Sequence, residues 1–332
     1  MGLFDFLFGG NETKISAQAY SRATSGKVIS FRKKFVEIPS LGFFGQFRKS
    51  HSGEWAICWS DSDEQNHRGG HRDSGHGCYV LYSIAQNKVA SQGRLERPNS
   101  GSVADNGSFS IEDWHFGSVL SGTFYVFSSG GKELIKKKFE ANLYNSSISD
   151  GGRFAVCQTA NSPTSEDGNR LTVFEIEKNI ELFSIHPPTG WADEYMFAED
   201  IPQLGVVINK IGTFRYDIKG NFIDSKKFDA ARLRCDRYDV VLLAAEEIVK
   251  APELNDQLAS AALEATIRAL ALGAEKDQGW KAVALKIQGL AHDFLRNNEA
   301  SIAAFDEALR INPKIGIKRK VDALRKKLVR NE

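Results

Sequence analysis

The sequence predicts two classes of structure in one chain, a series of small antiparallel β-sheets followed by an all-α region. The first observation is a set of short apolar segments with period-two alternation, which recur roughly every 45 residues between residues 14 and 232. The second is a change to helical spacing of apolar residues from residue 238 onward. At 332 residues the chain is long enough for two domains, so we predict domains at 14–232 and 238–332 after an apolar segment at 1–13.

The repeat is clearest in the stretch from Ser149 to Ile185. The turn Asp150-Gly151-Gly152 leads into the apolar segment Phe154-Ala155-Val156-Cys157, and two further strand-like segments follow it. The same order of a large apolar, a small, a β-branched and a variable residue recurs in three other places: Trp55-Ala56-Ile57-Cys58, Phe109-Ser110-Ile111-Glu112 and Leu204-Gly205-Val206-Val207. We therefore predict four copies of one small sheet, with Cys58 and Cys157 as equivalent buried residues.

Two further positions recur in each copy. The next strand carries an aromatic residue, and these residues are 45, 47 and 42 positions apart: Tyr82, Phe127, Phe174 and Tyr216. A last strand is predicted to end at these positions: Leu95, Phe139, Ile185 and Phe228. One such sheet exposes two apolar faces and cannot bury them alone, whereas radial packing against its neighbours covers both. Self-similarity at this period, with several strands per copy, is typical of a β-propeller.

Over roughly residues 14–230 the repeat resembles the blades of WD40-like β-propellers, although no Trp-Asp dipeptide closes a third strand. Two strands predicted near the N-terminus, Ile15–Tyr20 and Lys27–Ile38, would form a half-blade. The resemblance therefore implies four full blades plus an N-terminal half-blade. Three arrangements stay open: a five-bladed ring, a four-bladed ring with a clasp, and an open arc.

The C-terminal region is predicted to form five helices with short connections. One hairpin resembles a tetratricopeptide repeat, through residues that fit the spacing of that family: Leu285, Gly289, His292, Ser301, Phe305, Ala308 and Pro313. In this resemblance Gly289 and Ala308 let the paired helices approach, and Phe305 fills the gap between them. The resemblance implies a tetratricopeptide-like all-α domain.

The N-terminal segment and the cysteines bear on where in the cell the protein is located. Met1–Phe8 carries one charge among apolar residues. This pattern allows either weak membrane contact through Leu3–Phe8 or a terminal segment packed onto its own domain. No apolar run approaches the length of a membrane span. Four cysteines fit neither a zinc motif nor a disulfide framework, and no signal peptide is evident, so we predict a cytoplasmic protein.

The richest polar cluster lies in the predicted loop that ends at Gly77. Its histidines and neighbouring residues are a candidate metal site: His67, His71 and His76, with Asp61, Asp63 or Cys78. Their spacing fits no standard motif, so a solvated insertion is the favoured interpretation. No nucleophile has an evident base partner in the sequence. We therefore predict no enzymatic activity, no metal and no cofactor.

A nucleic-acid partner is the less favoured alternative. The net charge of +1 indicates no strongly basic surface. Basic residues do gather around the last predicted helix: Lys314, Lys318, Arg319, Lys320, Arg325, Lys326, Lys327 and Arg330. We interpret this helix as a terminal cap with a solvated face, because no aromatic platform for bases accompanies the charge.

Three of the four loops between second and third predicted strands are long: Asp61–Gly77, Asp113–Gly122 and Ala160–Arg170. In a propeller these loops share one face with the connections between blades. We predict that other proteins bind this face through seven residues: His67, Arg68, His71, Arg72, Trp114, Phe116 and Trp191. The alternative is that Trp114 and Trp191 pack beneath the loops. The main hypothesis is a non-enzymatic adaptor in a cytoplasmic complex, with an enzyme, a metal- or ligand-binding propeller and a nucleic-acid-associated factor as alternatives.

Overall fold

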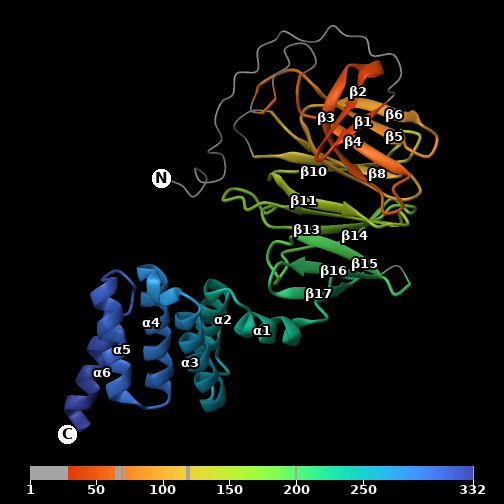
Figure 1. Ribbon diagram of the computed structural model, residues 1–332. Helices are drawn as coiled ribbons and strands as arrows, with labels where there is room; N and C mark the ends of the chain where they lie inside the picture. The colour runs from red at the N-terminus through yellow and green to blue at the C-terminus, as the bar shows by residue number, and fades with distance from the viewer. Residues whose placement is uncertain (1–28, 64–68, 71, 117–119, 199, 332) are drawn as a thin grey trace.

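A computed structural model describes residues 29–331, apart from 64–68, 71, 117–119 and 199, with side chains to residue 327. The described residues form four antiparallel β-sheets followed by six α-helices. Figure 1 shows the sheets stacked one on the next and the helices leading away from the last sheet. The predicted N-terminal segment 1–13 and the strand Ile15–Tyr20 lie outside the described residues.

The strands follow chain order within each sheet. The first sheet contains β1 (Ser30–Arg32), β2 (Phe35–Ile38), β3 (Phe43–Lys49), β4 (Trp55–Ser60), β5 (Gly77–Ser83) and β6 (Lys88–Leu95). The second contains β7 (Pro98–Val103), β8 (Phe109–Trp114), β9 (Gly122–Phe127) and β10 (Glu133–Phe139). The third contains β11 (Leu143–Ile148), β12 (Phe154–Thr159), β13 (Leu171–Glu175) and β14 (Ile180–Ile185). The fourth contains β15 (Glu194–Ala198), β16 (Gln203–Ile208) and β17 (Gly212–Asp217).

The predicted repeat of strands is confirmed. Each of the four apolar segments lies in an observed strand, namely β4, β8, β12 and β16. The last strands of the first three sheets end at the predicted residues Leu95, Phe139 and Ile185. Cys58 and Cys157 are fully buried and occupy equivalent positions, each two residues after an alanine that pairs with the aromatic of the next strand.

The gapless alignment of the four segments is wrong by one residue in the second and fourth sheets. The recurring aromatic lies opposite the second residue of the segment in the first and third sheets, where Ala56 faces Tyr82. It lies opposite the first residue in the other two, where Phe109 faces Phe127. Because successive side chains point to opposite faces of a strand, a shift of one residue exchanges the two faces. Equivalent faces of the four sheets are therefore identified by the position of the recurring aromatic residue, and not by the order of large, small and β-branched residues.

Successive sheets bury apolar faces against each other. The core between the first and second sheets includes Leu81 and Phe109, and that between the second and third includes Phe124 and Phe174. The core between the third and fourth includes Val173 and Tyr216. Strands β7 and β11 contact strands of the preceding sheet, and β11 also contacts β15. Each sheet except those at the two ends of the series is thus covered on both faces. The number of blades and the closure of a ring remain predictions.

Two predicted strands are wrong. In the predicted strand Lys27–Ile38, the described part forms a hairpin, because Lys33 has a φ of 44° and turns β1 back onto β2. Both strands extend the first sheet instead of forming a separate half-blade. The last strand predicted to end at Phe228 is helical, because Ser225–Arg234 is rich in Ala, Lys and Arg and forms α1. Phe228 still fills the edge of the fourth sheet, with its ring 4.9 Å from that of Phe214.

The five predicted helices are confirmed and follow α1. They are α2 (Tyr238–Lys250), α3 (Asp256–Ala271), α4 (Gln278–Phe294), α5 (Asn298–Ile311) and α6 (Lys318–Asn331). In the α4–α5 hairpin Phe305 is fully buried against Gly289, where an added Cβ would lie 2.4 Å from the ring. Ser301 Oγ also donates to the carbonyl of Gly289 at 2.8 Å. The hairpin packs as its residues predict, while membership of the tetratricopeptide family stays a prediction.

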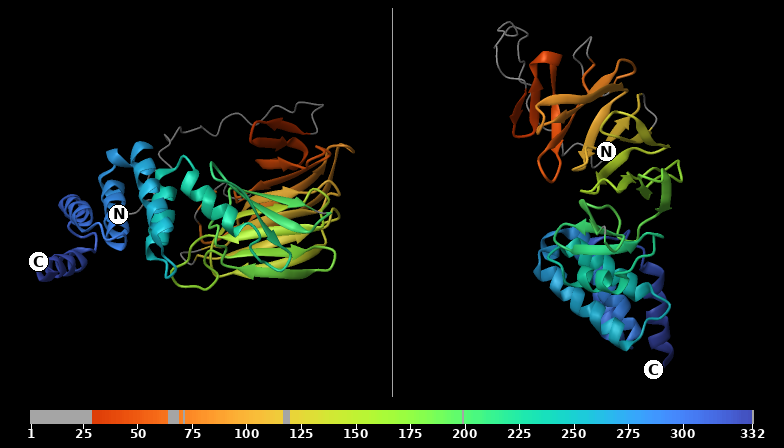
Figure 2. Two further views of the ribbon diagram at one scale, coloured as in Figure 1. Left: turned by 90° about the horizontal axis from the view of Figure 1, so that it is seen from below. Right: turned by 90° about the vertical axis from the view of Figure 1, so that its right-hand side faces the viewer.

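The helices join the fourth sheet through side-chain contacts as well as through α1. Ile211, in the turn between β16 and β17, packs against both the last sheet and the helical core. Arg232 Nη1 and Nη2 donate to the carboxylate of Glu247 at 2.6 and 2.7 Å, which ties α1 to α2. Figure 2 shows the helices beyond one end of the strands, which agrees with the contact of Ile211 with the helical core. Among the described residues, none of these helices has the length and apolar character needed to cross a membrane.

Candidate functional site

The antiparallel order of each sheet brings two kinds of segment to one end of the stack. These are the loops between second and third strands, at 61–76, 115–121, 160–170 and 209–211, and the connections between sheets, at 96–97, 140–142 and 186–193. The first sheet has six strands, and its last four, β3 to β6, correspond to the repeat. Its second and third repeat strands are therefore β4 and β5. We call this end the connection face.

Hydrogen bonds join each long loop to a neighbouring connection. Arg72 Nη2 donates to the carbonyl of Glu96 at 2.9 Å. The amide of Glu140 donates to Asp167 Oδ2 at 2.8 Å. These contacts link neighbouring loops and connections along the connection face.

The first predicted cluster of site residues is only partly described. His67, Arg68 and His71 lie outside the described residues. Arg72 is described, and its side chain is only 10% exposed. Its Nη1 donates to Asp61 Oδ1 at 2.5 Å, and the guanidinium lies 5.5 Å from the centre of the Phe116 ring. Arg72 therefore fastens the loop to the second sheet.

The second predicted cluster packs beneath the loops. Trp114 ends β8 and lies against the core between the second and third sheets. Its amide donates to the carbonyl of Arg97 at 3.0 Å. Phe116 sits under Arg72, and its amide donates to Glu96 Oε2 at 3.2 Å. Trp114 therefore occupies the packed position that the alternative interpretation describes, whereas Trp191, the other residue of that alternative, is exposed.

Trp191 is the most accessible of the four predicted site residues that the structure describes. Its side chain is 45% exposed, and its ring centre lies 5.5 Å from that of Tyr144, which is 48% exposed. Trp191 Nε1 donates to the carbonyl of Thr159 at 3.3 Å, which holds the edge of the indole while its face stays accessible. The sequence analysis missed Tyr144, although its position one residue after buried Leu143 in an alternating strand was a usable signal.

Two buried or half-buried amides hold the segment that carries Trp191. Gln158 is fully buried, and its Nε2 donates to the carbonyl of Gly190 at 2.9 Å while its Oε1 accepts from the amide of Ala192 at 3.0 Å. Asn145 Nδ2 donates to the carbonyl of Ala192 at 3.1 Å. The connection on both sides of Trp191 is therefore anchored to strands of the third sheet. A rigid, pre-ordered aromatic side chain loses little entropy when it binds.

Burial changes the ionisation of acidic groups next to the connection face. It raises the pKa of Asp113 to about 6, although the amide of Arg97 donates to this carboxylate at 2.7 Å. Burial also raises the pKa of Glu112, whose Oε1 accepts from Ser146 Oγ at 2.6 Å between the second and third sheets. These groups support packing between sheets. No group of three or more His, Cys, Asp or Glu that could hold a metal occurs in the described part of the chain.

The basic residues of α6 are partly neutralised by acidic neighbours. Lys320 Nζ lies 2.9 Å from Asp293 Oδ2 on α4. Arg325 Nη2 lies 2.6 Å from Asp306 Oδ2 on α5. These pairs link α6 to the preceding helices α4 and α5.

Comparisons with known proteins leave the family open. No protein-family model matches the chain, and no curated protein matches it. A structure of the Dos1 propeller is similar over 55% of this chain and 45% of its own, with 12% identity and a TM-score of 0.36. A crystal structure of the mitotic checkpoint complex is similar over 57% of this chain and 58% of its own, with 9% identity and a TM-score of 0.36. This chain thus spans less than two thirds of either match, and the fold is described from its own strand pairing.

Proposed function

We propose that this chain is a non-enzymatic interaction scaffold that binds another protein through the connection face, in a cytoplasmic complex. In this proposal the four sheets act as blades of an open WD40-like propeller, and the helices form a tetratricopeptide-like unit that presents a second surface. The observation that carries the proposal is the exposed pair of Trp191 and Tyr144.

The composition of this pair suits a binding hot spot. Trp and Tyr are enriched among the interface residues whose truncation costs the most binding energy. Trp191 and Tyr144 together offer two neighbouring aromatic rings, tilted by 31° with centres 5.5 Å apart, and the hydrogen bonds from Gln158 and Asn145 hold the neighbouring backbone in place. A partner can therefore cover large apolar rings without first ordering the segment that carries them.

The test is quantitative affinity purification from the native source with tagged full-length protein. We expect Trp191→Ala and Tyr144→Ala each to reduce the recovery of the main partner by at least about tenfold, equivalent to about 1.4 kcal/mol. The matched control is Ile180→Ala, because Ile180 is 43% exposed at the opposite end of the same sheet. Far-UV circular dichroism and thermal melts check that each variant is folded. Folded Trp191 and Tyr144 variants that recover the same proteins as wild type would refute the proposal.

A further inference from the structure

Acidic residues gather at the end of the third and fourth sheets that carries Trp191 and Tyr144, which we call the aromatic pair. The segments of the connection face that border these two sheets are 140–142, 160–170, 186–193 and 209–211. They contain four acidic residues and two basic ones, which are Glu140, Glu166, Asp167 and Asp193 against Arg170 and Lys210. The whole chain has a net charge of +1, so this region is acidic in a chain that is not.

Hydrogen bonds place two of these acidic residues next to the aromatic pair. Thr159, whose carbonyl accepts from Trp191 Nε1, donates through Oγ1 to the carbonyl of Asp167. Asn145, which directly follows the tyrosine of the pair, donates through Nδ2 to the carbonyl of Asp193 at 3.0 Å. Two residues that carry negative charge are therefore held beside the exposed rings.

The exposed parts of the two rings have no cation over them within the described chain. Arg170, the basic residue of the loop 160–170, already donates to the carbonyls of Glu166 and Ser184 at 3.0 and 3.2 Å. Elsewhere in the described residues, a lysine or arginine lies 4.5 to 5.9 Å from the centre of each of seven rings: Phe31, Phe116, Tyr125, Phe139, Phe154, Phe214 and Phe228. Neither ring of the aromatic pair is among these seven, so both are open to a cation from another molecule.

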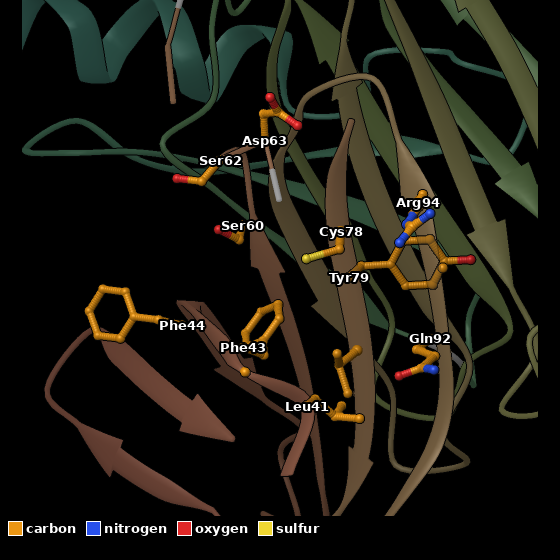
Figure 3. A pocket seen from close by; sticks show the side chains of 13 residues that line it. Leu41, Phe43, Phe44, Ser60, Ser62, Asp63, Cys78, Tyr79, Gln92 and Arg94 are labelled. Atoms are coloured by element: carbon orange, nitrogen blue, oxygen red, sulfur yellow. The ribbon is translucent and has the colours of Figure 1, made fainter. Parts of the chain in front are cut away.

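The groove at the connection-face end of the first sheet differs in its charge. It has a volume of about 770 Å³ and is lined mainly by residues of β3 to β6 and of the loop after β4. Figure 3 shows one acidic and one basic residue on its walls, Asp63 and Arg94, together with the uncharged side chains of Ser60, Cys78 and Gln92. These opposite charges favour neither sign in a partner, whereas the surroundings of the aromatic pair favour a positive one.

We propose that the aromatic pair receives an arginine or lysine side chain from a positively charged segment of the partner, an inference that rests on the proposed function of this face. A cation over the face of a Trp or Tyr ring is attracted by the negative potential of that face, more strongly when water is excluded. The neighbouring carboxylates attract the same charge over a longer range and raise the rate of encounter. Arginine suits the site best, because its planar guanidinium stacks on a ring while its N–H groups donate to a carboxylate.

Nuclear magnetic resonance of the indole N–H groups tests this chemistry directly. The chain contains five tryptophans, so the indole spectrum of the full-length protein is simple, and Trp191→Phe identifies the Trp191 signal. The probes are three peptides of equal length, Gly-Arg-Gly-Arg-Gly, Gly-Gln-Gly-Gln-Gly and Gly-Glu-Gly-Glu-Gly. The other four indole signals are the internal control.

We expect the arginine peptide to shift the Trp191 signal with a Kd of about 1 mM and to bind at least about tenfold more tightly than the glutamine peptide. The glutamate peptide should bind most weakly, and Tyr144→Ala should remove the preference for arginine. Equal binding of the three peptides overturns the proposal, as does the lack of a saturable shift with the arginine peptide up to about 10 mM.

Charge reversal in the affinity purification tests the same inference on the natural partner. Glu166 is exposed in the loop 160–170, and its matched control is Glu177, which is exposed in the turn between β13 and β14 at the other end of the same sheet. We expect Glu166→Lys to reduce recovery of the main partner at least about fivefold at low salt, and the difference from wild type to shrink as salt screens the charges. Glu177→Lys should recover the partner as wild type does, and thermal melts check that both variants are folded.

The two proposals fail in different ways. If Trp191→Ala loses the partner while Glu166→Lys recovers it as wild type does at every salt concentration, the face binds a protein but the inferred charge of that protein is wrong. If Trp191→Ala recovers the same proteins as wild type, the proposed function fails. In that case the peptide titration, which reads the Trp191 signal itself, still decides whether the aromatic pair binds a cation.

Discussion

The close approach of Gly289 to Phe305 leads to a prediction that tests the packing of the helical hairpin. A Cβ added at Gly289 would lie 2.4 Å from both Cδ1 and Cε1 of Phe305 and 2.9 Å from Cγ. Phe305 is fully buried, so its ring has little room to move. Gly289→Ala must therefore push α4 and α5 apart or force the ring from its position.

The expected loss follows from two opposing effects. Overpacking a buried site costs about 1–3 kcal/mol, whereas replacing glycine by alanine inside a helix gains about 1 kcal/mol. We expect Gly289→Ala to lower the free energy of unfolding by up to about 2 kcal/mol, and to be about 1–3 kcal/mol less stable than an alanine substitution that meets no clash. The control is Gly279→Ala in the same helix, where a new Cβ would meet only Asp277 Oδ1 at 3.3 Å. This control should be neutral or slightly stabilising.

The assay is urea unfolding followed by circular dichroism at 222 nm, which reports mainly on the helices. Phe305→Leu should relieve the clash, so the double variant with Gly289→Ala should be more stable than the sum of the single effects predicts. A favourable coupling of about 0.5–3 kcal/mol is expected for residues in contact. If Gly289→Ala is as stable as Gly279→Ala, or if the double variant shows no coupling, the helices do not approach through these residues.

Three further predictions concern buried groups and the junction. Cys58 and Cys157 are fully buried, and burial raises the pKa of Cys58 to about 12. Neither thiol should therefore react with a thiol reagent at pH 8 until the protein unfolds. Rapid labelling of either cysteine in the native protein, mapped by mass spectrometry, would contradict their buried positions. Burial raises the pKa of Glu112 above its unfolded value of about 4.3, so its contribution to stability is present below that unfolded pKa and is lost as the pH rises from there through the higher folded pKa. Thermal melts should show Glu112→Gln more stable than wild type at pH 8 but not at pH 4, and an equal difference at both would refute this cause. Arg268 Nη2 donates to the carbonyls of Arg234 and Cys235 in the segment between α1 and α2. Arg268→Ala should therefore speed trypsin cleavage between residues 232 and 237. Unchanged yields of the cleavage fragments would show that other contacts protect this segment.

The strands and helices were predictable because their signals are local. A short apolar segment after the Asp150-Gly151-Gly152 turn marks β12, and apolar spacing near 3.6 marks α3. The same local patterns gave wrong predictions where one residue sequence is compatible with two kinds of local structure. A single turn residue, Lys33, divides a predicted strand into a hairpin, and Phe228 reads equally well as the end of a strand or as one apolar residue of a short helix.

The candidate site was predictable only in part. Trp191 was identified from its place in a blade connection, and it is exposed as expected for a contact residue. The exposure of Tyr144 could have been read from its position after buried Leu143, but its contact with Trp191, 47 positions away, could not, because no local pattern joins the two residues. Contact of Arg72 and Phe116 with partners stays a prediction. Within the chain, Arg72 Nη2 and the amide of Phe116 both donate hydrogen bonds to Glu96, in the connection between the first two sheets.

By itself, the sequence determined the order of strands and helices, the four-fold repetition of a small sheet and the burial of Cys58 and Cys157, because each depends on neighbours along the chain. Only the tertiary structure decided which face of each sheet meets the next, since shifting a strand by one residue exchanges its faces without changing its alternation. Tertiary structure also decided that Trp191 stays accessible while Trp114 is packed. The difference arises from contacts between distant segments, such as the hydrogen bond from Gln158 to Gly190, which no spacing within either segment encodes.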